Sequence, residues 1–237
     1  MIRKFSYCYW ELRYRLRKWL WDRSVKKSKI NGMALMYHHV SDMHIDTNES
    51  CQCSTAEFIN TLLQIKADQR QFVSVDTMMN IIKEKQTIKF AVVTFDDVPE
   101  NFYTNAYPFL KQEKIPFILF ITTSFIDKLG YLSKEQLIEI DRDPLCTIGA
   151  HTLTHPMLRN VDNIKEELVK SKALLEEIVD HTVDFMAYPY GRQSSVSKRV
   201  MREAKEAGYK CSFGTIQSPI TDVSAKNLYY LPRIVKK

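Results

Sequence analysis

The stretch Ala91-Val92-Val93-Thr94-Phe95-Asp96-Asp97 predicts a short, fully buried strand that ends in two adjacent carboxylates. Its residues are apolar and β-branched almost without interruption, which is typical of a strand in the middle of a sheet. Two adjacent acids repel each other unless a cation or a proton separates them. An isolated Asp-Asp pair after a strand is most often a solvated turn or a helix cap, so its meaning depends on the rest of the chain.

Two histidines four residues apart give that pair a chemical context. They lie in His151-Thr152-Leu153-Thr154-His155, directly after a second short apolar stretch at Thr147–Ala150. Two imidazoles and one carboxylate are a common ligand set for a first-row divalent metal ion. The two motifs together therefore predict a metal site.

Strands and helices alternate from residue 31 to residue 237, which predicts an α/β chain with a parallel sheet. About seven strands in roughly 200 residues favour a (β/α) barrel, complete or incomplete, over an open sheet. Barrel enzymes carry their sites at the carboxyl ends of the strands. The polar residues that follow predicted strands are expected to converge there: His38, Asp96, Asp97, His151, His155 and Tyr190.

Positive charge is concentrated in residues 1–30. This segment has ten Lys and Arg against two acidic residues, a local charge of +8, and the other 24 basic and 26 acidic residues sum to −2. A nearly neutral body argues against nucleic-acid binding by the whole chain. We therefore divide the chain into a basic helical extension, 1–30, and an α/β domain, 31–237.

One amphipathic helix is expected over residues 1–29. Arg and Lys surround an apolar stripe, a composition that suits an anionic membrane surface. Packing of the stripe on the domain itself or on a second subunit, and a targeting presequence, are alternative interpretations. Apolar residues recur in the stripe at spacings of three and four, namely Ile2, Phe5, Tyr9, Leu12, Leu16 and Trp19.

Location is expected to be cytoplasmic, with peripheral attachment to the inner face of the membrane. The N-terminal segment lacks the apolar core of a secretory signal, and no apolar run is long enough to span a bilayer. Five cysteines without such a signal favour free thiols in a reducing compartment.

From about residue 32 onward, three motifs in order resemble those of the polysaccharide deacetylases, the NodB-homology or carbohydrate esterase family four group. They are Thr94–Asp97, His151–His155 and Tyr188-Pro189-Tyr190-Gly191. The resemblance implies a deformed (β/α) barrel that holds one divalent cation, usually zinc, on Asp97, His151 and His155. It also implies Asp96 as general base and the backbone N–H of Tyr190 as an oxyanion donor.

The general acid is expected near the start of the domain. The C-terminal histidine of the common pattern has no counterpart after His181, but Met36–Val40 resembles the start of the rearranged branch, which includes poly-N-acetylglucosamine deacetylases. By position this assigns the acid to His38, with His39 as the reserve. A histidine held only by a local carbonyl is the alternative for either.

Two departures from the family pattern affect the expected activity. Ala187 replaces the arginine that orients the base, and Val98 replaces the glycine that usually follows the two acids. Arg233, at the end of a last strand expected over Leu228–Ile234, is the candidate replacement for the missing arginine. The chain is therefore expected to remove N-acetyl groups from amino sugars of a bacterial surface glycan, glycolipid or precursor. Hydrolysis of another carbon–nitrogen amide bond and a non-catalytic glycan-binding or membrane role are the alternatives.

Overall fold

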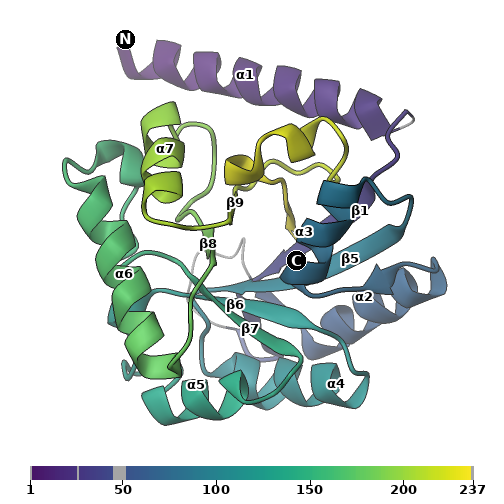
Figure 1. The fold of residues 1–237 in the computed structure, drawn as a ribbon, viewed down its shortest axis with the longest axis vertical. Coiled ribbons are helices and arrows are strands. Elements are labelled where there is room, and N and C mark those ends of the chain that lie inside the picture. Colours follow the sequence, from purple (N-terminus) through teal and green to yellow (C-terminus); the bar gives the residue numbers. More distant parts are fainter. Residues whose placement is uncertain (1, 26, 45–51, 236–237) are drawn as a thin grey trace.

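A curled parallel sheet forms the centre of the molecule, with helices around it (Figure 1). The computed structural model describes residues 2–25, 27–44 and 52–235. Within them, seven strands follow one another in the order β10-β1-β5-β6-β7-β8-β9, and β4 also pairs with β5. All of these pairs are parallel, which confirms the expected deformed (β/α) barrel. The strands are β1 (Asn31–Tyr37), β4 (Gln71–Phe72), β5 (Lys89–Asp96), β6 (Phe117–Ile121), β7 (Cys146–Ala150), β8 (Phe185–Ala187), β9 (Cys211–Phe213) and β10 (Ile234–Val235).

Burial on both faces explains the unbroken apolar sequence of the central strands. From Phe90 to Asp96 every residue of β5 is buried. Val93 and Phe95 belong to the larger apolar cluster with the outer helices, whereas Phe90 and Val92 belong to a second cluster inside the curl. The alternation places consecutive side chains on opposite faces of the sheet.

Helices cover the outside of the sheet (Figure 1). Serine caps at Ser54 and Ser133 form complete capping boxes, with Glu57 and Gln136 three residues on. The α-helices are α1 (Ile2–Val25), α2 (Thr55–Ala67), α3 (Val75–Glu84), α4 (Tyr107–Gln112), α5 (Lys134–Asp141), α6 (Ile164–Val179) and α7 (Lys198–Glu206). Shorter elements are the strand pair β2 (His39–Val40) and β3 (Gln52–Cys53), the π-turn η2 (Phe102–Ala106), and the 3₁₀ turns η3 (Thr123–Phe125), η4 (Leu158–Asn160), η5 (Ser224–Lys226) and η6 (Leu228–Tyr230).

The last segment of the chain joins the two ends of the sheet. Leu231 forms a parallel bridge with Phe213 at the end of β9, and β10 pairs with β1 a few residues later. A single strand over Leu228–Ile234, expected from its apolar residues, is therefore wrong. The 3₁₀ turn η6 comes first, and only Ile234–Val235 pairs as a strand with β1. This closing segment, residues 231–235, is the seam of the barrel, and it places the side chain of Arg233 in the interior, where it is fully buried.

Helix α1 lies across one side of the molecule, near α7 and the C-terminal turns (Figure 1). Trp21 is buried in the main apolar cluster, and Tyr14 packs against that cluster. The described part of the predicted stripe faces away, because Tyr9, Leu12, Leu16 and Trp19 are all more than half exposed; the side chains of Ile2 and Phe5 lie outside the described part. Packing of these four residues on the domain, one of the alternatives, is therefore wrong. Among the described helices, none combines the length and the apolar character needed to cross a membrane.

Candidate metal and catalytic site

Asp97, His151 and His155 lie together at the carboxyl edge of the sheet. Asp97 directly follows β5, and His151 directly follows β7, two strands away across β6. One ligand atom from each residue lies within 4.8 Å of the others. His155 Nε2 lies 3.5 Å from Asp97 Oδ1, and His151 Nε2 lies 4.0 Å from the same oxygen. The structure thus brings together the three residues that the motifs pointed to.

The donor set fits a small divalent cation. Tetrahedral Zn²⁺ with bonds of about 2.1 Å separates its ligand atoms by roughly 3.4 Å, close to the spacing of this cluster. The ring of His151 is oriented by Nδ1, which donates a hydrogen bond of 2.8 Å to the carbonyl oxygen of Ala187. That leaves the Nε2 lone pair directed at the cluster, the arrangement usual in metal-binding histidines. Burial lowers the pKa of His151 to about 4, so the ring is neutral near pH 7.

Hydrogen bonds also orient the other two ligands. The hydroxyl of Thr122, at the end of β6, donates to Asp97 Oδ1 at 2.9 Å. The backbone N–H of His155 donates to the hydroxyl of Thr152 at 3.1 Å. Both hydroxyl partners are fully buried, so each ligand is held from behind by a group that cannot move into solvent.

The backbone at the site adopts unusual conformations. Asp97, Val98, His155 and Tyr190 all have φ between 49° and 61°. For the β-branched Val98 this left-handed region is strained, which explains why a glycine is the usual residue there. Val98 is nevertheless tolerated because its side chain is buried against the apolar cluster. The turn directs the carboxylates of Asp96 and Asp97 to the same edge.

Asp96 is buried and paired with Arg233. The guanidinium donates to both carboxylate oxygens, at 2.5 and 2.7 Å, and also donates to the Thr94 hydroxyl and the Gly214 carbonyl oxygen. Burial alone would raise the pKa of Asp96, but the charge of Arg233 and the neighbouring histidines hold it well below its usual value. Asp96 is therefore ionised at neutral pH. Arg233 thus contacts the carboxylate that the arginine missing at Ala187 is expected to orient.

His38 and His39 differ in their contacts. His38, between β1 and β2, places Nε2 4.0 Å from Asp96 Oδ2. The Nδ1 atom of His39 instead accepts a hydrogen bond of 3.0 Å from the Asn101 side-chain amide. Burial and then the neighbouring His38 lower the pKa of His39. Of the two, His38 is the one in direct reach of the carboxylate pair.

Aromatic and apolar residues surround the open side of the cluster. The Tyr190 ring is exposed and lies 5.1 Å from the ring of His155. Phe125 contacts the other side of His155 at 6.0 Å between ring centroids. Beside Asp97 there is a small, mostly apolar hollow lined by Val98, Ile121, Thr122, Phe125, Ile126, Tyr131, Leu132 and Leu137.

Glu167 is a functional candidate that sequence reasoning missed. From helix α6 its carboxylate accepts hydrogen bonds from the backbone N–H groups of Leu153 and Thr154, at 3.1 and 2.9 Å. It also accepts a bond of 2.7 Å from the Thr154 hydroxyl. These residues form the loop between the two histidines, so Glu167 fixes that loop. An acid in the first turn of a helix carries no sequence signal that separates this role from ordinary helix capping.

The fold and the site define a parallel (β/α) barrel with a His₂Asp cluster that could hold a metal ion at its carboxyl edge. The chain belongs to the polysaccharide deacetylase family, whose model matches residues 83–212. Among curated proteins, a poly-β-1,6-N-acetyl-D-glucosamine N-deacetylase of Staphylococcus aureus is 28% identical over 90% of this chain and 82% of its own length. The enzyme of the same name from Staphylococcus epidermidis is 26% identical over the same shares.

Solved structures share the fold. A polysaccharide deacetylase from Bacillus cereus superposes with a TM-score of 0.77 at 25% identity over 87% of this chain, which spans 65% of that protein. The deacetylase PplD of Streptococcus pyogenes, solved with acetate, gives a TM-score of 0.77 at 23% identity over 87% of this chain and 92% of that one. IcaB of Ammonifex degensii gives 0.75 at 22% identity over the same shares.

Proposed function

We propose that this protein is a metal-dependent hydrolase that removes N-acetyl groups from amino sugars of a bacterial surface glycan or its precursor. One observation carries the proposal: an ionised carboxylate, Asp96, lies beside the Asp97–His151–His155 cluster and accepts hydrogen bonds from Arg233 on both of its oxygens. A single metal ion with a separate adjacent base is one arrangement that suits hydrolysis of an unactivated amide.

Asp97, His151 and His155 would hold the cation, and zinc is the ion we propose. When bound, such an ion polarises a carbonyl oxygen and makes water more acidic. The three residues leave coordination positions for substrate and solvent, which a catalytic rather than structural site requires. The neutral state of His151 supports this assignment, because only the unprotonated ring binds a metal.

Asp96 is the proposed general base. Its Oδ2 atom lies 3.8 Å from His151 Nε2, so a water molecule at the cluster falls within its reach. Both oxygens already accept bonds from Arg233, but a carboxylate has about four lone-pair sites and keeps capacity for another donor. His38 would then supply the proton that the leaving amine needs, because its Nε2 lies 4.0 Å from the same carboxylate oxygen.

The surroundings of the cluster suit an acetamide. The apolar hollow beside Asp97 has the chemistry to take a methyl group. Tyr190 lies over His155, and its backbone N–H is the proposed donor to the developing oxyanion. The exposed Tyr190 ring offers a flat apolar surface of the kind that sugar rings stack on.

The proposed partner is an N-acetylated glycan or glycolipid, as the names of the staphylococcal relatives suggest for those proteins. We further propose that the enzyme meets it at an anionic membrane surface, to which residues 1–29 attach it. The expected cytoplasmic location stays a prediction, which cell fractionation tests.

Acetate release and metal content test the proposal together. Purified protein loaded with zinc should release acetate from an N-acetylglucosamine oligomer and should contain about one metal ion per chain. If the protein releases no acetate from the oligomer but releases formate or ammonia from small amides, its substrate is another amide and not an N-acetylated sugar. Bound metal without any turnover would leave the non-catalytic alternative.

A further inference from the structure

Helix α1 has two faces with different roles. The inner face packs on the barrel: Trp21 is 5% exposed, and Arg17 stacks between Trp21 and Tyr230, 5.5 Å from each ring centroid. Trp10 lies under the guanidinium of Arg159 at 4.4 Å. The outer face presents an exposed row of large apolar side chains, Tyr9, Leu12, Leu16, Trp19 and Leu20, with exposed fractions of 52, 68, 56, 51 and 49%.

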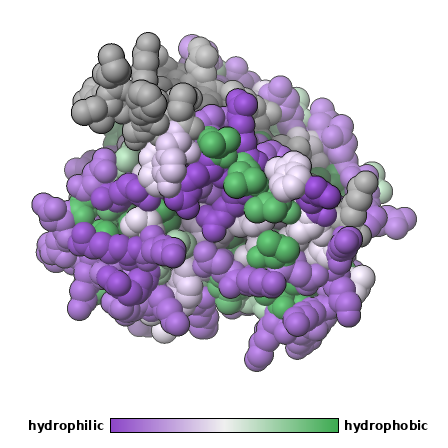
Figure 2. All heavy atoms as spheres, turned by 90° about the horizontal axis from the view of Figure 1, so that it is seen from above, coloured by the Kyte–Doolittle hydropathy of each residue, from purple (hydrophilic) through white to green (hydrophobic). Residues whose placement is uncertain are grey.

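The outer row is large for a surface that meets only water. Scattered exposed leucines are common, but five large apolar residues on one stripe of one helix form a contiguous patch of the kind that binds something. Figure 2, which views the molecule from the side of α1, shows a band of hydrophobic and pale aromatic side chains flanked by hydrophilic ones. The row therefore needs an apolar partner.

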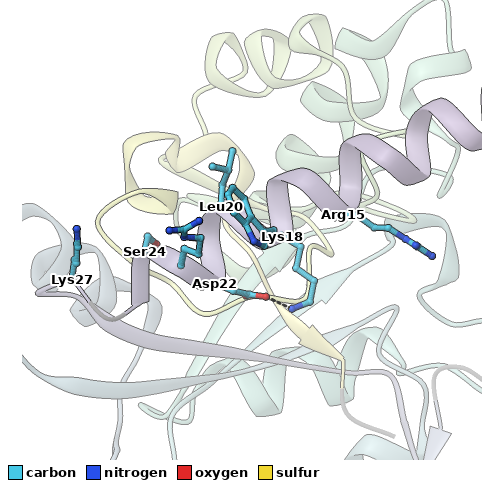
Figure 3. A pocket seen from close by; sticks show the side chains of 8 residues that line it. Arg15, Lys18, Leu20, Asp22, Ser24 and Lys27 are labelled. Atoms are coloured by element: carbon cyan, nitrogen blue, oxygen red, sulfur yellow. Dashed lines mark hydrogen bonds and ion pairs between the residues drawn. The ribbon is translucent and has the colours of Figure 1, made fainter.

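Positive charge accompanies this row. An open hollow of about 820 Å³ along α1 is lined by Trp19, Leu20 and Ser24, by four cations and by a single acid, Asp22 (Figure 3). The two acids of the helix are already occupied, Glu11 by Arg15 at 2.9 Å and Asp22 by Lys18 at 2.5 Å. The excess charge at the outer face thus comes from other cations, chiefly Arg13, Arg23 and Lys27, which are all exposed.

We propose that the outer face of α1 docks on an anionic phospholipid bilayer, with the apolar row inserted at the headgroup level and the cations on lipid phosphates. This combination of an aromatic- and leucine-rich stripe with basic flanks is what interfacial helices use. A second copy of the chain is a poorer partner, because a two-fold contact would bring identical cations together. Arg23 stacks on Trp19 at 4.6 Å, which places a cation directly beside the inserted row.

The inner face fixes how the docked protein is oriented. Arg159, held on Trp10, donates to the carbonyl oxygen of Gln193 at 3.3 Å. Tyr230, under Arg17, donates to the carbonyl oxygen of Gly191 at 2.8 Å. Both acceptors lie in the loop that follows Tyr190. The bilayer would therefore lie roughly one helix diameter, about 10 Å, from this loop. The docking develops the membrane attachment proposed above for residues 1–29 and does not depend on deacetylase activity; only the consequence for substrate access rests on that activity.

Vesicle sedimentation of the full chain tests the docking. The wild-type protein should co-sediment with vesicles of phosphatidylcholine and phosphatidylglycerol, and should bind pure phosphatidylcholine far less. Leu12→Ser with Leu16→Ser should weaken binding roughly a hundredfold, about tenfold for each buried leucine. Arg23→Gln with Lys27→Gln should weaken it roughly thirtyfold, since each cation near an anionic surface contributes a factor of about five.

Matched controls separate the helix from general surface effects. Leu63→Ser with Leu174→Ser removes two exposed leucines, 44 and 41% exposed, from α2 and α6. Lys83→Gln with Arg142→Gln removes two exposed cations elsewhere. Both control pairs should bind as the wild type does.

Equal binding of the wild type to neutral and anionic vesicles would overturn the proposal. So would a wild type that does not bind vesicles but sediments as a dimer, if the Leu12→Ser, Leu16→Ser variant is a monomer. Acetate release from a soluble oligomer should be the same in all these variants. A wild type that binds vesicles without releasing acetate refutes the deacetylase activity alone.

Discussion

The guanidinium of Arg233 contacts both carboxylate oxygens of Asp96, across 137 positions of sequence, in a fully buried pair. Burial alone would raise the pKa of Asp96, and the arginine is the main reason that the carboxyl stays ionised. The ionised state of Asp96, the proposed general base, therefore depends on a residue in the segment that closes the sheet. This relationship gives the first prediction.

Arg233→Met should move the acidic limb of the pH–rate profile to higher pH, because the loss of the cation lets burial raise the pKa of Asp96. Turnover near neutral pH should fall by roughly 100-fold or more. Breaking a buried pair costs about 3–5 kcal/mol of stability, so Arg233→Lys, which keeps the charge, serves as the second variant. Arg233→Lys should keep the acidic limb close to that of the wild type. A shift to higher pH in this charged variant, or an unchanged limb with full activity in Arg233→Met, would show that the charge of Arg233 does not set the pKa of Asp96.

Asp96→Asn and Asp97→Asn should differ in metal content: the first variant should keep its metal ion and the second should lose it. The first removes the base, so turnover should fall below detection while the protein still binds about one zinc ion. The second removes a ligand, so metal and turnover should be lost together. Metal analysis after dialysis checks both. If Asp96→Asn is the variant that loses the metal, the roles of the two acids are exchanged.

Glu167→Gln should weaken metal binding without unfolding the barrel. Its carboxylate accepts three hydrogen bonds from the loop between His151 and His155, and supporting partners of metal ligands typically contribute 10–100-fold to affinity. Titration with a zinc-buffered indicator measures the change. Glu166→Gln, one residue away but paired with Lys170 in solvent, is the matched control and should retain full affinity.

His38→Gln should lower kcat by about 10²–10⁴, the usual contribution of a positioned acid. His39→Gln should cost much less, because His39 Nδ1 is already engaged by Asn101. Steady-state kinetics on the same oligomer compares the two. A larger loss of kcat in the His39 variant than in the His38 variant would identify His39 as the general acid.

Metal-free protein should lose stability as pH falls from 6.5 toward about 4. Burial lowers the pKa of His151 from 6.5 to about 4, so in this window the unfolded chain binds a proton that the folded chain does not. Stability therefore rises with pH across the window, by about 3 kcal/mol for a shift of this size. Urea unfolding of metal-free wild type and His151→Asn checks this. A slope equal in both proteins would contradict it.

Much of the site could be predicted because each motif directly follows a strand. In a parallel barrel the residues after β5 and β7 must reach the same edge, so Asp97, His151 and His155 converge whatever the details of the loops. The fold followed from the same alternation. Arg233 was found only as the nearest arginine to a predicted strand end, and that strand proved to be a 3₁₀ turn followed by two paired residues.

The sequence could not show which side chains of the N-terminal helix pack on the barrel and which face away from it. The helical period of residues 1–29 identified an apolar stripe, but it did not tell which aromatic residues face the barrel. Trp10 and Trp21 flank the stripe in sequence and turn out to pack inward, while Trp19 faces out. Contacts with Arg159 and Tyr230, far along the chain, decide this. Glu167 was missed for a similar reason, because its hydrogen bonds with Leu153 and Thr154 form only when helix α6 packs beside their loop.

The seam between β9 and β1 also separates two events during refolding. The proposed ligands Asp97, His151 and His155 follow strands that are near neighbours through β6, so we expect ion capture to need only the middle of the sheet. The ionised state of Asp96 needs Arg233, which arrives only when the final segment is seated. We expect zinc uptake by denatured protein diluted from urea to precede the return of catalysis, and the delay between the two signals to report barrel closure.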